Sequence, residues 1–155
     1  MAVIGVYYTH LEDYIIQLYQ YLSIEKPHQL RIGIIANKLG LSVYYGNATF
    51  RYYNSIILKR TNRRREWQSF GHEVGHYLRH HGNQLRLHPL FADLQEHQAN
   101  HFAYHFCVPT FMLKEIKGVT ANDIARLFNV EFDFALRRLE MYENKLIERA
   151  GVKNK

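Results

Sequence analysis

The sequence predicts an α+β fold in which helices surround a small antiparallel sheet. Apolar residues recur at helical spacing towards both ends of the chain, aromatic and β-branched residues gather in a short central stretch, and turn-forming residues separate these segments. The chain has 155 residues, of which 47% are hydrophobic. This length and composition suit a single domain over residues 1–155 with one hydrophobic core.

In the first half of the chain, two helices are expected before the sheet. Apolar side chains recur at helical spacing over residues 10–22, and Pro27 suits the start of a second helix over 28–39, which Gly40 would end. A turn is expected at Gly46-Asn47 and a hairpin around Asn54. The expected strands cover residues 41–45, 49–53 and 55–58.

In the second half, helices are expected to follow one another. Pro109 would end one of them, and Thr120 with Asp123 can form a capping box at the start of another. The main core is therefore expected over about 28–116 and a C-terminal helical part over about 117–149. The expected helices cover residues 64–81, 91–107, 111–116, 120–128 and 132–149, with a polar loop over 82–89.

The first of these helices contains the pattern H-E-x-x-H, from His72 to His76. On a helix the two imidazoles lie one turn apart and can bind one metal ion, with Glu73 beside them. Gly71 and Gly75 lower the helix propensity, which is acceptable where another element must approach the backbone closely. Catalytic zinc requires a third protein ligand and an open position.

Glu96 can supply that third ligand from the helix expected over 91–107. It lies on a strip of small residues, Ala92, Ala99 and Ala103, that would let this helix approach the motif helix closely. Asn100, one turn after Glu96, can orient a ligand. The competing ligands are other histidines of the second half, namely His80, His81, His88, His97, His101 and His105.

This ligand set predicts hydrolytic chemistry. Zinc held by two imidazoles and a carboxylate lowers the pKa of a bound water, and Glu73 would act as the general base. Four residues are candidates for stabilising the oxyanion: Tyr45, Tyr52, Tyr53 and His88. A further hypothesis is that the strand over 55–58 offers an edge to which an extended substrate adds.

Two linked stretches resemble the ImmA/IrrE-type zinc metallopeptidases of bacteria and their mobile elements. They are H-E-V-G-H at 72–76 and E-H-Q-A-N-H-F-A at 96–103, the latter running on to Pro109. The resemblance covers roughly residues 30–116. It implies zinc at His72, His76 and Glu96, with Glu73 as the catalytic base. It also implies a protein substrate, a helix-turn-helix repressor whose removal switches on genes of a phage or integrative element. Some relatives have an additional DNA-binding or sensory domain, and this chain is expected to be a minimal version.

Charge and cysteine content indicate the cellular location and the kind of partner to expect. The single Cys, Cys107, excludes an internal disulfide and is interpreted as a buried core thiol. Neither a signal peptide nor a membrane span is recognisable, so a cytoplasmic location is expected and no membrane partner. The net charge of +6 favours acidic partners.

Two alternative functions stay open. Residues 119–130 resemble the opening of a helix-turn-helix, which would indicate a DNA-binding regulator, although Glu131, Asp133 and Glu140 would face phosphates unfavourably. The other alternative is a zinc-bearing protein that sequesters a repressor without cleaving it. Such a protein would have no need of a base at Glu73.

Overall fold

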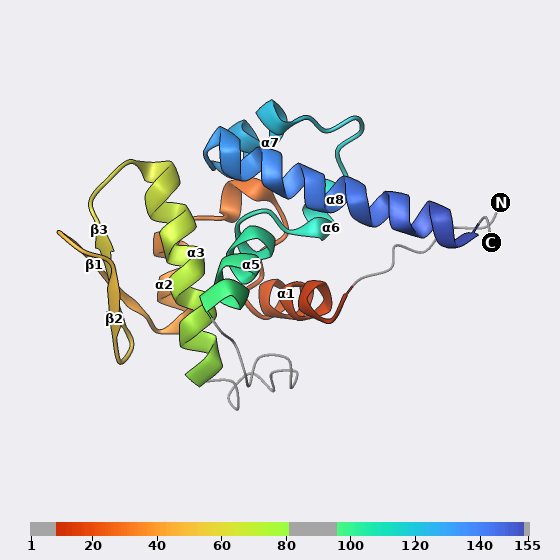
Figure 1. The fold of residues 1–155 in the computed structure, drawn as a ribbon. Helices are drawn as coiled ribbons and strands as arrows, with labels where there is room; N and C mark the ends of the chain where they lie inside the picture. The colour runs from red at the N-terminus through yellow and green to blue at the C-terminus, as the bar shows by residue number, and fades with distance from the viewer. Residues whose placement is uncertain (1–8, 81–95, 154–155) are drawn as a thin grey trace.

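The computed structural model describes residues 9–80 and 96–153, without the side chains of 79, 80, 96, 97 and 148–153. A small sheet lies at one edge of the molecule, α3 packs against it, α2 contacts its strand β1, and α1, α5, α6, α7 and α8 lie on the side of α3 away from the sheet (Figure 1). This is the expected α+β class, with helices in the majority. The polar loop over 82–89 and residues 91–95 of the next helix lie outside the described part.

The two N-terminal helices begin and end at residues with specific local hydrogen bonds. In α1 (His10–Tyr21), Thr9 and Glu12 form a capping box. The second expected helix is divided into a 3-10 turn η1 (Pro27–Gln29) and α2 (Ile32–Leu39). The side chain of Gln29 accepts hydrogen bonds from the backbone N–H groups of Glu25 and Lys26, so the turn closes on itself. Gly40 ends α2 with a left-handed φ of 72°.

The sheet is mixed, so the expectation of an antiparallel sheet was wrong. Its strands are β1 (Ser42–Gly46), β2 (Phe50–Tyr52) and β3 (Ser55–Lys59), in the spatial order β1-β3-β2. The hairpin around Asn54 joins β2 to β3 as expected, but β3 inserts between the other two strands and pairs with β1 in parallel. Both edges of β3 are therefore occupied, which removes the hypothesis that this strand adds a substrate.

The two motif-bearing helices, α3 (Arg63–His80) and α5 (Glu96–Cys107), pack closely against each other. A Cβ atom added at Gly71 would lie 2.8 Å from Cys107 Sγ and 3.6 Å from Ala103 Cα, and one added at Gly75 would lie 2.9 Å from Phe102 Cδ1. The two glycines therefore allow the close approach that their low helix propensity suggested. Cys107 is fully buried, as expected, and burial raises the pKa of its thiol.

We expect Gly71→Ala to lower the free energy of unfolding by about 1–2 kcal/mol, since overpacking costs about 1–3 kcal/mol and the gain in helix propensity is at most about 1 kcal/mol. Gly33→Ala in α2 is the matched control, because nothing lies within 4 Å of a Cβ added there. It should stabilise by about 0.5–1 kcal/mol. Urea denaturation of both variants measures the difference, and equal effects of the same sign would contradict the packing account.

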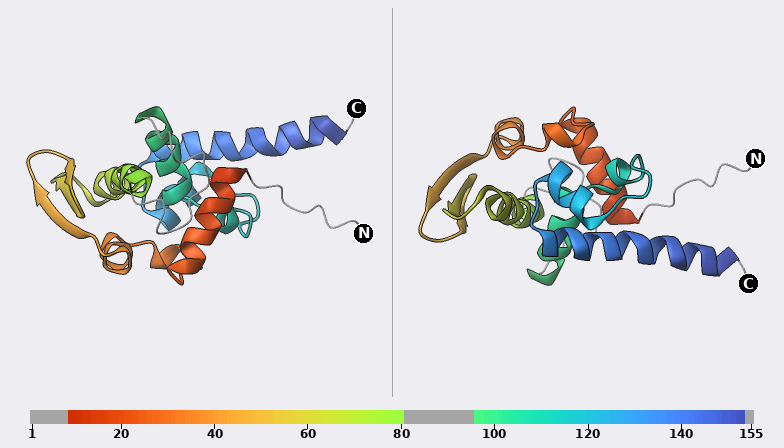
Figure 2. Two further views of the ribbon diagram at one scale, coloured as in Figure 1. Left: turned by 90° about the horizontal axis from the view of Figure 1, so that it is seen from below. Right: turned by 90° about the horizontal axis from the view of Figure 1, so that it is seen from above.

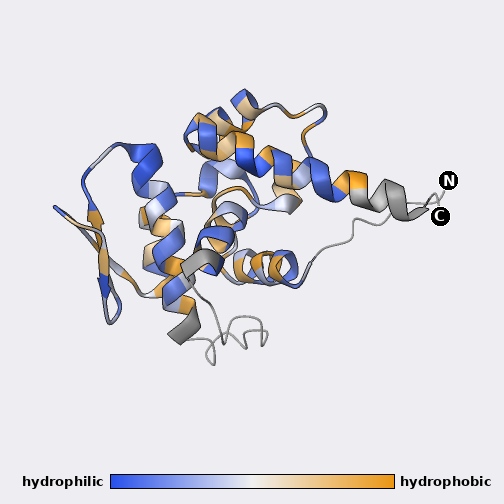
Figure 3. Ribbon diagram, viewed as in Figure 1, coloured by the Kyte–Doolittle hydropathy of each residue, from blue (hydrophilic) through white to orange (hydrophobic). Residues whose placement is uncertain are grey.

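The C-terminal helices complete the core. They are α6 (Thr110–Leu113), α7 (Ala121–Phe128), which has the expected Thr120–Asp123 capping box, and α8 (Phe132–Lys153). Figure 2 shows α8 running along the side of the molecule away from the sheet. Apolar residues alternate with polar ones around α1 and α3 (Figure 3), and the buried ones form one cluster that extends from α1 to the start of α8. Among the described helices, none combines the length and the apolar composition of a membrane span.

Candidate active site

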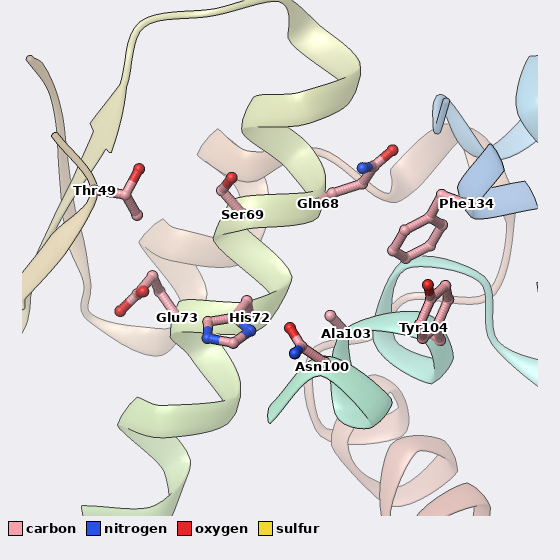
Figure 4. Close-up of a pocket in the computed structure, with 9 residues that line it drawn as sticks. All are labelled: Thr49, Gln68, Ser69, His72, Glu73, Asn100, Ala103, Tyr104 and Phe134. Carbon is pink, nitrogen blue, oxygen red and sulfur yellow. The ribbon is translucent and has the colours of Figure 1, made fainter. Parts of the chain in front are cut away.

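A cleft of about 480 Å³ lies beside the H-E-x-x-H segment. Ser69, His72 and Glu73 of α3 line it, facing Asn100 and Tyr104 of α5, with Thr49 before β2 at one end and Phe134 of α8 at the other (Figure 4). The opposite side of α3 is buried: Trp67, Phe70, Val74 and Leu78 are at most 2% exposed. The helix thus presents its polar side to the cleft and its apolar side to the core, as its periodicity predicts.

The two motif imidazoles converge. The Nε2 atoms of His72 and His76 are 3.1 Å apart, and both rings are half-buried. Two nitrogens bound to one tetrahedral zinc ion at about 2.05 Å each lie about 3.3 Å apart. The separation of the two Nε2 atoms is therefore close to that of two ligands of one zinc ion.

Glu73 points from α3 towards the sheet, where Arg51 of β2 approaches it. Arg51 Nε lies 3.4 Å from Glu73 Oε2, and the two side chains are 23% and 13% exposed. Arg51 Nε is buried and makes no hydrogen bond with a described residue. The contact is thus an ion pair that holds the Glu73 carboxylate at the cleft.

Arg51 was not identified from the sequence. In β2 the side chains alternate, so that Phe50 and Tyr52 are exposed on the outer face of the sheet and Arg51 shares the inner face with Ile56, its pairing partner. Alternation places Arg51 opposite the two aromatic residues. It does not say which of the two faces meets the motif helix, because aromatic side chains are ordinarily expected on the buried face.

The structure brings Asn100 into the cleft next to His72, and the side chain of Asn100 is exposed there (Figure 4). The backbone of Glu96 starts α5 one turn earlier, but its side chain lies outside the described part. Among the described side chains, a set that excludes Glu96, no three His, Cys, Asp or Glu residues gather as a metal site. The role of Glu96 as third ligand thus stays a prediction.

Most of the competing ligands lie outside the described side chains, namely His80, His81, His88 and His97. His101 and His105 form a second pair on α5, with ring centroids 4.8 Å apart. Burial and the positive charge of Arg138 lower the pKa of both imidazoles, that of His105 well below its usual value. Nearby positive charge opposes a bound cation, so this pair is a poor metal site.

The three tyrosines considered as oxyanion donors do not line the cleft. Tyr52 and Tyr53 are 66% and 78% exposed, and their rings contact each other edge to face. The ring of Tyr45 lies under the guanidinium of Arg60, at 4.0 Å. These side chains therefore belong to the sheet surface. His88, the fourth candidate, lies outside the described residues.

Two neighbouring imidazoles and an adjacent carboxylate suit a metallopeptidase-like protein, the class to which the family comparison points. The chain belongs to the peptidase family described as the IrrE N-terminal-like domain, whose model matches residues 28–140. This confirms the resemblance drawn from the two motifs.

The chain is also similar to two proteins of Bacillus subtilis (strain 168). The chain is 38% identical to the phage-like element PBSX protein XkdA over 159 residues, covering 96% of this chain and 79% of the relative. It is 33% identical to the uncharacterized protein YqaB over 151 residues, covering 90% and 88%. No solved structure matches the chain significantly.

Proposed function

We propose that this protein is a zinc-dependent endopeptidase that cleaves a helix-turn-helix repressor in the cytoplasm and so induces genes of a phage or mobile element. The 3.1 Å separation of the Nε2 atoms of His72 and His76, with His72 and Glu73 lining the cleft, carries the catalytic part of the proposal. Membership of a peptidase family and the similarity to a protein of a phage-like element support the biological part.

The packing of α3 and α5 supports Glu96 as the third ligand. The helices are antiparallel, because Gly71 lies against Cys107 and Gly75 against Phe102. Asn100 shares the cleft with His72. One turn further along α3 is His76, and one turn back along α5 is Glu96, so the two are expected at the same level of the cleft. Asn100 would then lie one turn from Glu96 and could orient its carboxylate.

Each residue of the proposed site would have its own role in peptide hydrolysis. A zinc ion bound by His72, His76 and Glu96 would supply the positive charge that polarises the scissile carbonyl. Glu73 would accept the proton of the attacking water and return it to the leaving amine. Tyr104 and Phe134, whose rings stack with centroids 4.3 Å apart at one end of the cleft, would contact the substrate on one side of the scissile bond.

Arg51 is expected to act as a positioning residue for Glu73. Arg51→Met should lower kcat by about 10²-fold with little change in KM, because the contact fixes the base rather than the substrate. Arg51→Lys keeps the charge and should recover part of kcat. Steady-state kinetics of both variants test this, and a rise in KM with unchanged kcat would show that Arg51 binds substrate instead.

The exposed residues of α8 argue against the DNA-binding alternative. After α7, Asn129 adopts a left-handed φ of 56° and α8 begins at Phe132, a geometry similar to a helix-turn-helix. The exposed residues in the first turns of α8 are Phe132, Asp133, Leu136, Arg137 and Glu140, and the one basic residue among them, Arg137, pairs with Glu140. Apolar and acidic side chains are poorly suited to a phosphate backbone.

The proposal is tested by incubating the zinc-loaded protein with helix-turn-helix repressors encoded in the same genome and measuring intact masses. One repressor should yield two fragments whose masses sum to that of the intact chain plus one water. A chelator should prevent this, and added zinc should restore it. If repression is relieved in the cell while every repressor stays intact, the sequestering alternative replaces the peptidase.

A further inference from the structure

A second cavity, of about 630 Å³, lies apart from the cleft and shares no lining residue with it. Its walls come from four parts of the chain: the segment from η1 to the start of α2, strand β1, the first turns of α3 and the end of α7. The volume lies within the range of sites for small molecules, roughly 300–1,000 Å³.

The rim of this cavity is positively charged. Arg31, Arg63 and Arg126 line it, and neither Arg31 nor Arg63 forms an ion pair with any described residue. Arg126 faces Asp123 at 3.6 Å on the exposed surface. The one acidic lining residue, Glu66, is 6% exposed and already pairs with Arg60 at 3.7 Å, so it does not neutralise the rim.

The inner wall of the cavity is apolar. Trp67, which is 2% exposed, lines it. Leu30, which is 7% exposed, and the half-exposed ring of Tyr45 complete this wall.

We propose that this cavity binds a small phosphorylated molecule with an aromatic ring, the chemical class of the mononucleotides. Guanidinium groups such as those of Arg31 and Arg63 bind phosphate through two parallel hydrogen bonds. The apolar wall formed by Leu30, Tyr45 and Trp67 suits a ring. The proposal is independent of the peptidase assignment, because no residue of the cleft takes part.

The chain itself provides the probe, since Trp67 is its single tryptophan. Adenosine monophosphate, titrated into the full chain, should change the fluorescence of Trp67 saturably. Adenosine and inorganic phosphate should each bind at least about tenfold more weakly, because adenosine lacks the phosphate group and inorganic phosphate lacks the aromatic ring. Calorimetry on the same solutions detects binding that leaves the fluorescence unchanged.

Substitutions on the rim locate the site. Arg31→Met and Arg63→Met should each weaken binding about tenfold. Arg65→Met is the matched control, because Arg65 lies outside the cavity and pairs with Glu131 at 3.1 Å, and His72→Ala is the control for the cleft. Neither control should change the affinity.

Four results would overturn the proposal. One is the absence of binding by both methods. Another is phosphate binding as tightly as the nucleotide, which would indicate an adventitious ion only. The third is an equal effect of Arg65→Met and Arg63→Met, which would indicate non-specific charge attraction. The last is binding of an acidic peptide where adenosine monophosphate fails, which would assign the cavity to a protein partner.

Discussion

Glu73→Gln is expected to lower kcat/KM for peptide hydrolysis by about 10²–10⁴-fold, the range that general-base catalysis contributes. Gln has the same shape as Glu but cannot accept the proton of the attacking water at neutral pH. Because Glu73 is not among the proposed metal ligands, the zinc content should stay unchanged. Initial rates on a cleavable repressor, measured together with metal analysis, separate the two effects.

Glu143→Gln is the matched control for this variant. Glu143 is an exposed acid of α8, outside the cleft, and its replacement should leave the rate unchanged. A Glu73→Gln protein that cleaves at the native rate would contradict the assigned role. Loss of zinc in that variant would instead assign Glu73 to the metal ligands.

Arg138→Met is expected to cause the largest loss of stability, about 3–5 kcal/mol, since it removes one member of a buried charged network. Arg138 is 1% exposed and donates hydrogen bonds to the carbonyl of Val108 at 2.9 Å and to Thr110 Oγ1 at 2.8 Å. Thr110 in turn donates to Glu12, which Lys145 approaches at 2.6 Å. Methionine leaves the two acceptors of Arg138 buried without a donor.

Burial lowers the pKa of Arg138 to about 10 although Glu12 raises it, so the guanidinium stays charged at neutral pH. The expected fall in Tm is about 6–20 °C at 2–4 °C per kcal/mol. Arg137→Met is the matched control, because the neighbouring Arg137 is exposed and pairs only with Glu140 on the surface, at 3.4 Å. Calorimetry of both variants should show a change of less than about 2 °C for Arg137→Met. Equal changes in Tm would mean that the network contributes little.

Local patterns predicted the helices well, because their determinants lie within a few residues. The capping box of Thr120 and Asp123 and the glycine end of α2 at Gly40 are formed by neighbours in the sequence. The helix expected over 28–39 is interrupted at Leu30 and Arg31, whose backbone leaves the helical region, with ψ of 81° and 137°.

Strand order was not predictable in the same way. Turn residues identify the hairpin of β2 and β3, but the pairing of β1 with β3 depends on contacts between residues such as Tyr44 and Ile57 that no local pattern specifies. Arg51 was missed as a consequence, because its position beside Glu73 follows from where β2 lies in the sheet. The second cavity was also missed, since its rim joins residues as distant as Arg31 and Arg126.

For the helix that carries H-E-x-x-H, the sequence predicted which side chains face the same way. Helical spacing placed His72 and His76 on one side and the apolar residues on the other, and the structure has both. Gly71 and Gly75 predicted a close neighbour, which is α5. The third ligand depends on how a second helix is placed against the first, which spacing within one helix does not specify.

Metal analysis of the purified chain tests the central claim most directly. The account predicts about one zinc ion per chain in the native protein, its loss in His72→Ala and in Glu96→Ala, and its retention in His101→Ala, which alters the second histidine pair of α5. Zinc that persists in both His72→Ala and Glu96→Ala but disappears in His101→Ala would place the metal elsewhere and contradict the account.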